Sequence, residues 1–343
     1  MGIWYDKGLL CSHNALFNFT LGARGTGKTF CFKLWALTKT TQTVWVRRHE
    51  EDLHSKIGAG LLDGDKFLKD VVAEGYIDPA EYRQEANSIL RNYGTEEFPD
   101  WRVQIQFIAL KTSSRVKSQS YHDTDMMVYD EFLERNQSKY IKNEAEVFLE
   151  LYETVNRLRL DGRKEVRVFF LANNISFINP YFAYWNILPF EGRFKTFKNG
   201  LICVESYSNQ AFVEAKKATK FGQLIDGTKY GDYAIDNVVW MDDEAFISDV
   251  QPNSVLRYNL HVDGVYYGVW FGKDWITISR KYNLEALTYA PLMSCEDGEY
   301  PFRKTSQVYK GLEQCYLYQL LRFEDVMCKN VFFTMMQTSL LEL

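Results

Sequence analysis

The sequence predicts an α/β protein with a parallel central sheet in its first domain, followed by a smaller α+β domain. Three observations carry this prediction. Short apolar runs of strand length alternate with helical stretches through the first half of the chain. One of these runs leads into a glycine-rich loop, and another ends in two adjacent acids, Asp130 and Glu131. Beyond about residue 250 the runs become short and are separated by turn signals.

Strands that are buried on both faces read as continuous apolar or β-branched runs. Met126–Tyr129 and Val166–Ala172 are continuous apolar runs, and Thr43–Val46 is β-branched and aromatic. Ala15–Leu21 is also strand-like, and Val103–Leu110 alternates as a strand does, so five strands are expected in the first domain. Two stretches with helical periodicity lie between them, Thr29–Thr38 and Glu144–Leu158. Residues 50–100 are polar and favour helix, with loop signals at Gly58 and Gly64. This order predicts βα units and hence parallel pairing.

A polar, glycine-rich stretch from Gly192 to Asp236 indicates the domain boundary. We therefore expect a first domain over 1–195, a lid-like connection over 196–235 and a second domain over 236–343. Within the second domain, Val255–Ile278 reads as successive short strands around a hairpin turn at Asp263-Gly264. The final 30 residues read as helical.

The composition limits the function classes. Hydrophobic residues make up 46% and charged residues 25%, which is typical of a globular protein and excludes a coiled coil or a collagen-like repeat. No apolar run approaches the roughly 18 residues of a membrane span. The six cysteines form no C-x-x-C pair, so we expect reduced thiols in a cytosolic protein. The first seven residues contain no basic region followed by an apolar stretch, so we expect no secretory signal. The net charge of −5 argues against a protein that coats nucleic acid.

The glycine-rich loop matches the pattern G-x-x-x-x-G-K-[ST], which predicts binding of ATP. Its residues are Gly22, Ala23, Arg24, Gly25, Thr26, Gly27, Lys28 and Thr29. The glycines let backbone N–H groups converge on a phosphate, and the helix that follows adds the positive end of its dipole. Lys28 supplies a point charge for the β- and γ-phosphates, and the Thr29 hydroxyl is expected to ligate Mg²⁺.

Polar residues end two other expected strands. A carboxylate at the end of a buried strand, Asp130, is placed to hold the Mg²⁺ ion and its water shell. The adjacent Glu131 is then expected to orient the attacking water, which favours a hydrolase over a kinase. Asn173, at the end of the following strand, is the candidate sensor of the γ-phosphate, although Asn is also common at strand ends.

Four arginines are candidates for control of the reaction. Arg157 and, after it, Arg159 follow a helix, and one of them is expected to reach the γ-phosphate of a neighbouring subunit. Cations that favour the end of the helix dipole are the alternative. Arg47 and Arg48 follow the second strand, and one of them is expected to hold Glu131 away from the water. Arg48 is the one included among the catalytic candidates. Ordinary surface arginines are the alternative here.

With these motifs in place, the chain resembles the DNA-encapsidation ATPases of phi-29-like podoviruses. The resemblance covers about residues 15–275, and the final 65 residues or so match poorly. It rests on the phosphate loop and on three further segments: Val46-Arg47-Arg48, Asn179-Pro180-Tyr181-Phe182 and the long run from Thr219 to Gly231. The last segment carries no obvious catalytic chemistry and is therefore the most specific.

The resemblance implies a ring of subunits, expected to be a pentamer, docked on the portal of an empty procapsid in the host cytoplasm. Each subunit would couple ATP hydrolysis to translocation of double-stranded DNA. The first domain would be a P-loop ATPase of the additional-strand, conserved-glutamate class, like those of terminases and of FtsK and HerA. The second would resemble an RNase H-like nuclease domain without nuclease activity. Some members use a packaging RNA, and the sequence does not say whether this chain does.

An acidic pI suits such a motor, because neutralising many phosphates tightly would stall a protein that must release DNA at every step. A few contacts from a loop facing the pore are expected instead. The candidates are Lys56 in the glycine-flanked segment 54–64, and Arg115 and Lys117 in a stretch without acids before Asp130. Each is otherwise an ordinary exposed cation.

Three other functions share some of these features. A P-loop kinase or small-molecule ATPase has the loop but more often lacks the Asp-Glu pair. A helicase-like DNA-dependent ATPase shares the acid pair, but it needs a second motor lobe that residues 230–343 do not offer. A structural ring component that does not hydrolyse ATP is the third alternative. It is the least favoured, because it would have no use for the complete set of Lys28, Thr29, Asp130 and Glu131.

Overall fold

The structure, a computed structural model, divides into two compact units. The first comprises Met1–Glu134, Tyr140–Ile175 and Phe190–Trp240, and the second comprises Arg135–Lys139, Ser176–Pro189 and Met241–Leu343. The structure describes residues 2–336 except for the following positions: 40, 117–120, 135–139, 158, 160, 161, 163, 174–178, 186, 188, 189, 191, 236–245, 263, 319, 326, 327, 330, 333 and 334.

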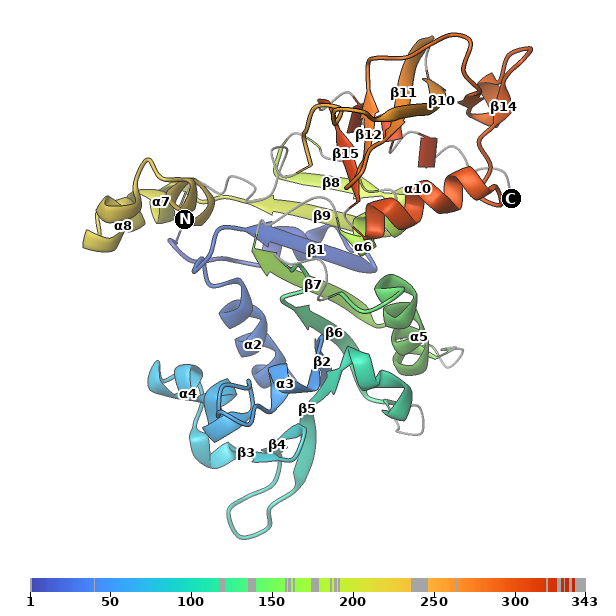
Figure 1. Ribbon diagram of the computed structural model, residues 1–343. Coiled ribbons are helices and arrows are strands. Elements are labelled where there is room, and N and C mark those ends of the chain that lie inside the picture. The colour runs from blue at the N-terminus through green and yellow to red at the C-terminus, as the bar shows by residue number, and fades with distance from the viewer. Residues whose placement is uncertain are drawn as a thin grey trace. The chain divides into compact units, whose positions relative to one another are not determined.

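The first unit is built on a nine-stranded sheet with the order β3-β4-β5-β2-β6-β7-β1-β9-β8 (Figure 1). The six strands from β5 to β9 in this order pair in parallel, and antiparallel strands close both edges. The strands are β1 Phe17–Gly22, β2 Gln42–Arg47, β3 Tyr82–Glu85, β4 Ser88–Asn92, β5 Trp101–Ala109, β6 Thr124–Asp130, β7 Arg167–Asn173, β8 Phe194–Phe197 and β9 Ile202–Tyr207.

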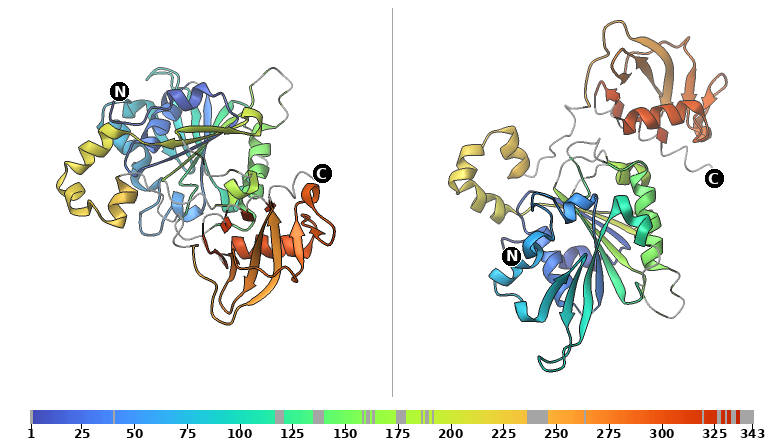
Figure 2. Two further views of the ribbon diagram at one scale, coloured as in Figure 1. Left: turned by 90° about the horizontal axis from the view of Figure 1, so that it is seen from above. Right: turned by 60° about the horizontal axis from the view of Figure 1, so that its bottom comes forward.

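Helices cover both faces of this sheet (Figures 1 and 2). The helices of the first unit are α1 Gly8–Ser12, α2 Lys28–Thr38, α3 Glu50–Leu53, α4 Lys66–Ala73, α5 Glu144–Asn156, α7 Gln210–Lys217, α8 Lys220–Ile225 and α9 Lys229–Ala234. Adjacent residues of β7 show why both faces are apolar. Phe169 packs on Phe32 of α2, and Phe170 packs on Phe148 of α5, with ring centroids 4.9 and 4.8 Å apart. A run of apolar residues is therefore what this strand needs.

The strand order places β7 between the strand that leads into the phosphate loop, β1, and the strand that ends in Asp130, β6. In the parallel register Gly22 of β1 lies beside Asn173 of β7, and Leu171 of β7 lies beside Asp130. This extra strand between the two motif-bearing strands confirms the additional-strand class of P-loop fold.

The sheet extends past residue 195, where the first domain was expected to end, because β9 also pairs with β1. Strand β9 was not predicted from the sequence because Glu205 interrupts its apolar run. The structure accommodates this buried carboxylate with the Arg193 guanidinium, 2.7 Å away, and the Tyr5 hydroxyl, 2.8 Å away. The β3–β4 hairpin likewise lies in the stretch that reads as helix-leaning. It is an edge hairpin with partly exposed polar side chains, so its apolar signal is weak.

The helical arm, defined as α7–α9 (residues 210–234), follows β9. It contains the segment that resembles the phi-29-like family most specifically. Thr219 and Thr228 cap α8 and α9 by accepting hydrogen bonds from Gly222 and Gly231. A Cβ at either glycine would lie about 2 Å from a backbone carbonyl of the preceding turn. The repeated T-K-[FY]-G pattern therefore has a packing role.

The second unit holds a six-stranded mixed sheet with the order β14-β13-β10-β11-β12-β15. Strands β10–β12 form an antiparallel meander, and parallel strands continue the sheet on both sides of it. Its elements are α6 Pro180–Trp185, β10 Val255–Val262, β11 Val265–Phe271, β12 Ile276–Ser279, β13 Thr288–Ala290, β14 Tyr300–Pro301, α10 Gln307–Leu317 and β15 Leu321–Phe323.

The hairpin expected in this unit joins β10 to β11, and residue 263 of its turn lies outside the described residues. The final 30 residues are not helical throughout. The helix α10 begins earlier, at Gln307, and a strand follows it because Leu321 and Phe323 enter the core beside β12. Throughout the described part of the chain, each helix is too short or too polar to span a bilayer.

Candidate nucleotide-binding site

The predicted site residues meet at one edge of the parallel sheet, called here the carboxyl edge because the strands end there. Strand β1 ends at Gly22, β2 at Arg47, β6 at Asp130 and β7 at Asn173. The carboxyl ends of parallel strands share an edge, so residues as far apart in the sequence as Gly22 and Asn173 become neighbours.

The phosphate loop leaves β1 and turns directly into α2. Gly25 and Gly27 have φ angles of 85° and 88°, which residues other than Gly rarely adopt. Gly22 is required for a different reason, because a Cβ there would lie 2.9 Å from the carbonyl oxygen of Tyr207 on β9. The loop backbone thus combines left-handed turns with a close approach to the neighbouring strand, as a cradle for an anion needs.

Lys28 lies inside this loop. Its Nζ donates to the carbonyl oxygens of Gly22 and Ala23, each 2.9 Å away, and lies 3.3 Å from Oγ1 of Thr26. Burial lowers the pKa of Lys28 to about 7, and the nearby Asp130 and Glu205 carboxylates oppose that shift. A desolvated ammonium held by the loop is a strong partner for a phosphate, since an anion compensates the cost of burying the charge.

Thr29 and Asp130 form the pair expected to hold a metal ion. The Thr29 hydroxyl donates to Oδ1 of Asp130 over 3.0 Å. Burial raises the pKa of Asp130, and the Arg47 guanidinium opposes this effect. Among the described residues, no group of three or more His, Cys, Asp or Glu side chains could hold a metal. The Thr29 hydroxyl and the Asp130 carboxylate are oxygen donors of the kind that binds Mg²⁺ together with nucleotide phosphates and water.

Glu131 directly follows this pair and has a φ of 58°. Its side chain is 63% exposed, and its Oε2 lies 2.6 Å from Nη2 of Arg47. The other nitrogen of the same guanidinium, Nη1, lies 3.2 Å from Oδ2 of Asp130. One arginine thus bridges both acids at the end of β6.

Arg48 has different partners from those predicted. Its buried guanidinium forms ion pairs with Glu144 and Glu134 over 2.8 and 2.9 Å. It also donates to the carbonyl oxygens of Glu131 and Phe132. The carboxylate of Glu131 is therefore held by Arg47, and Arg48 holds only the backbone that carries it. Consecutive residues at the end of a strand point to opposite sides, which explains the division.

Asn173 lies between the loop and the acids, beside Gly22 in the register of β1 and β7. Its side chain is half-buried. This is a suitable position for a group that contacts the γ-phosphate, and that role stays a prediction.

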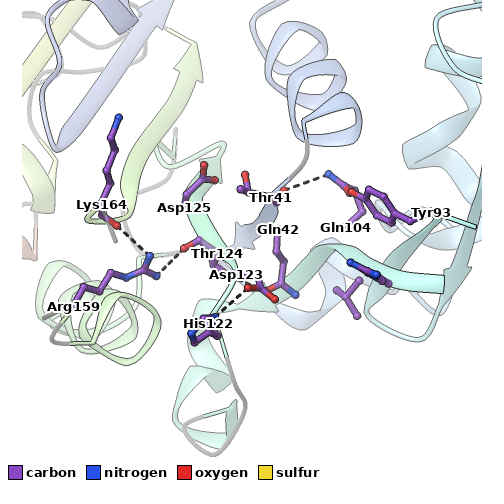
Figure 3. A pocket seen from close by; sticks show the side chains of 12 residues that line it. Thr41, Gln42, Tyr93, Gln104, His122, Asp123, Thr124, Asp125, Arg159 and Lys164 are labelled. Carbon is purple, nitrogen blue, oxygen red and sulfur yellow. Dashed lines mark hydrogen bonds and ion pairs between the residues drawn. The ribbon is translucent and has the colours of Figure 1, made fainter. Parts of the chain in front are cut away.

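The two arginines considered for action on a neighbour lie at the opposite, amino edge of the sheet. Arg159 lines a cavity of about 520 Å³ at the starts of β2, β5 and β6 (Figure 3). Its guanidinium donates to the carbonyl oxygens of Thr124 and Lys164, 2.7 and 3.1 Å away, so it braces the backbone. Arg157 is exposed, and its φ of 45° follows the last turn of α5. Neither arginine is placed to reach the phosphate loop of its own chain.

Two of the three DNA-contact candidates are exposed at the carboxyl edge. Lys56 lies in the loop after α3, and Arg115 lies in a 3₁₀ segment, η3 Leu110–Val116, that follows β5. The hydroxyl of Thr112 in η3 donates to Glu50 of α3 over 3.2 Å, which ties the two segments together. Lys117 lies outside the described residues.

The sequence offered no signal for a second set of loop contacts, because they come from distant segments. The N–H of Tyr5 donates to the carbonyl of Thr26 over 2.9 Å. Lys216 of α7 donates to the carbonyl of Arg24 over the same distance. The chain before β1 and the helical arm after β9 thus both support the phosphate loop.

The chain is similar to known proteins over most of its length. A family model of the podovirus DNA encapsidation protein (Gp16) matches residues 1–339. The DNA packaging protein of Bacillus phage B103 is 32% identical over 267 residues, which is 76% of each chain. That of Bacillus phage phi29 is 29% identical over 274 residues, 78% of this chain and 75% of the relative.

Two solved structures share the fold. One, of the bacteriophage phi-29 viral genome packaging motor assembly, covers 98% of this chain and 100% of its own, with a TM-score of 0.54 and 24% identity. The other, of the Phi-28 gp11 DNA packaging motor, covers 97% of each chain with a TM-score of 0.55 and 18% identity. With a family model that spans nearly its whole length, the chain belongs to the podovirus DNA encapsidation protein (Gp16) family.

Proposed function

We propose that this protein is an ATP-driven motor that translocates double-stranded viral DNA into a preformed procapsid. The observation that carries the proposal is the contact of Thr29 with Asp130, 3.0 Å long, with Glu131 directly beside it at the carboxyl edge. The names of its relatives, DNA packaging proteins of Bacillus phages, supply the process that this chemistry would drive.

In this proposal each group has one role. The eight residues from Gly22 to Thr29 bind the phosphates of ATP, and Thr29 and Asp130 hold Mg²⁺. When bound, the ion neutralises charge on the phosphates. Glu131 orients the attacking water and accepts its proton, and Asn173 contacts the γ-phosphate from β7.

Turnover in a homo-oligomeric ring, expected to be a pentamer, would depend on Arg157 acting on the ATP of a neighbouring subunit. Its position away from its own loop favours action in trans. Its backbone, with a φ of 45° and a ψ of 174°, supports it over Arg159, since strain of roughly 1–3 kcal/mol tends to cluster at functional positions. The ring would dock on the procapsid portal in the host cytoplasm, with or without a packaging RNA.

Steady-state ATP hydrolysis with and without long double-stranded DNA tests the proposal. We expect DNA to stimulate turnover without strand separation. A strand-displacement assay on a forked duplex separates this motor from a helicase, because a helicase releases the displaced strand. Activity that is indifferent to DNA, even with procapsids added, would point to a small-molecule ATPase instead.

Replacing Arg47 with Ala is expected to raise hydrolysis in the absence of DNA and to lower the stimulation factor several-fold. The ion pair of 2.6 Å between Arg47 and Glu131 would otherwise hold the carboxylate away from the water until DNA or a neighbour releases it. The measurement is the ratio of turnover with and without DNA. Arg83→Ala, at an exposed pair on β3, is the matched control. An unchanged ratio would rule out the gating role.

Replacing Lys56 or Arg115 with Ala is expected to weaken DNA binding about equally for all DNA sequences. Each lost phosphate contact should reduce the slope of log affinity against log salt concentration by about one. Fluorescence anisotropy of a labelled duplex at several salt concentrations measures this slope. Lys69→Ala, an exposed cation on α4, serves as the control. Slopes equal to that of the wild type would place the DNA path elsewhere.

A further inference from the structure

We propose that Trp4 is the surface on which the nucleobase of ATP stacks, with Phe212 behind it. This inference rests on the proposed function, because it assigns a place to the part of the nucleotide that the phosphate loop does not hold. It adds a residue that determines nucleotide affinity and selectivity, far from the motifs that identify the site in the sequence.

Trp4 is a large aromatic side chain held at the surface next to the phosphate loop. It is 62% exposed. A Cβ built on Gly27, the residue before Lys28, would lie 3.6 Å from its ring. What distinguishes Trp4 from other exposed apolar side chains is its place, because its open aromatic face lies directly beside the loop that would hold the phosphates.

The chain around Trp4 is fixed, so the ring is presented and does not merely protrude from a loose end. The side-chain amide of Asn209 donates to the carbonyl oxygens of Gly2 and Ile3, each over 3.1 Å. The next residue, Tyr5, points inward. It is 5% exposed, its N–H bonds the loop, and its hydroxyl donates to buried Glu205 over 2.8 Å. Figure 1 shows this start of the chain beside α7.

Phe212 of α7 supports the ring from one side. The ring centroids of Trp4 and Phe212 are 6.3 Å apart and the planes are tilted by 57°. Phe212 is itself buried, and the Lys216 ammonium lies 5.3 Å from its centroid. Phe212 therefore fixes the position of Trp4 and leaves the ring of Trp4 as the accessible aromatic surface.

The position of Trp4 relative to the acids fits a base and not a phosphate. Asp130, Glu131 and Asn173 lie on the side of β1 occupied by β7 and β6. The γ-phosphate must lie toward them, because they are the groups proposed to act on it. The nucleoside end of the same ligand then leaves the loop on the other side of β1, toward β9. Both Trp4 and Phe212 belong to segments packed on that side.

Stacking on an indole uses the face of the base and does not read its edge, so it tolerates different bases. The area of overlap is larger for a purine than for a pyrimidine. The structure thus assigns to Trp4 a preference for purine over pyrimidine triphosphates, with little discrimination between ATP and GTP from this contact alone.

Binding of MgATP and of magnesium tripolyphosphate, which has the phosphates but no base, tests the assignment by isothermal titration calorimetry. For Trp4→Ala we expect the Kd for MgATP to rise roughly tenfold. The Kd for tripolyphosphate should stay within about twofold of the wild-type value. Trp4→Phe should restore most of the affinity for ATP. Phe98→Ala, another exposed aromatic, is the matched control and should change neither Kd.

Equal weakening of both ligands by Trp4→Ala would overturn the assignment, because Trp4 would then merely support the loop. Unchanged affinity for ATP would overturn it as well. A wild-type protein that binds neither ligand would overturn the proposed function and this inference together. The ratio of the affinities for ATP and CTP gives a second readout, which should fall toward one in Trp4→Ala if the inference holds.

Discussion

Glu131→Gln is expected to lower DNA-stimulated ATP hydrolysis by about 10²–10⁴-fold while ATP binding is retained. The amide keeps the size of the side chain but cannot accept a proton from water. The phosphate loop and the Thr29–Asp130 pair do not involve this side chain, so affinity for the nucleotide should persist. Steady-state turnover with long duplex DNA and calorimetric titration with ATP measure the two quantities separately.

Glu74→Gln is the matched control for this variant, since Glu74 is an exposed acid at the end of α4 and should leave turnover unchanged. Undiminished turnover in Glu131→Gln would contradict the mechanism. Loss of ATP binding would instead show that Glu131 supports the nucleotide and not the water.

Arg48→Met is expected to reduce the free energy of unfolding of the first unit by about 3–5 kcal/mol. The substitution leaves the fully buried Glu144 without its cation. It also removes both hydrogen bonds to the carbonyl oxygens of Glu131 and Phe132. Urea unfolding followed by circular dichroism measures the loss.

Arg83→Met provides the comparison for this stability effect. Arg83 pairs with Glu85 over 2.9 Å, but both side chains are about half exposed, so the change should cost less than about 1 kcal/mol. A loss for Arg48→Met no larger than that of Arg83→Met would contradict the inferred role of the buried cluster. In a variant that remains folded, reduced turnover with normal ATP affinity would indicate that Arg48 positions the backbone of Glu131.

Much of the site could be predicted because it depends on local sequence and on one topological rule. The phosphate loop is contiguous, and its glycines and lysine identify it without any knowledge of the fold. Asp130, Glu131 and Asn173 each follow an apolar run, and parallel strands bring the ends of such runs to one edge. The strand order then confirmed that β7 separates β1 from β6.

The division of labour between Arg47 and Arg48 could not be predicted. Both follow the same strand, and either has the reach and charge to pair with Glu131. Which arginine pairs with Glu131 depends on the side of the sheet to which each side chain points and on the acids that lie there. Arg47 meets Asp130 and Glu131, and Arg48 meets Glu144. Those partners lie 83 to 96 positions away in the sequence.

The sequence by itself determined the α/β class, the phosphate loop and the acids that face it, because backbone propensity, burial pattern and loop chemistry act over a few neighbouring residues. The tertiary structure alone decided that β9 completes the sheet around buried Glu205, and that Trp4 and Lys216 flank the phosphate loop. These features follow from the balance of desolvation and pairing between distant segments. Such a balance leaves no local pattern, since each partner is an ordinary residue until the fold brings the other one to it.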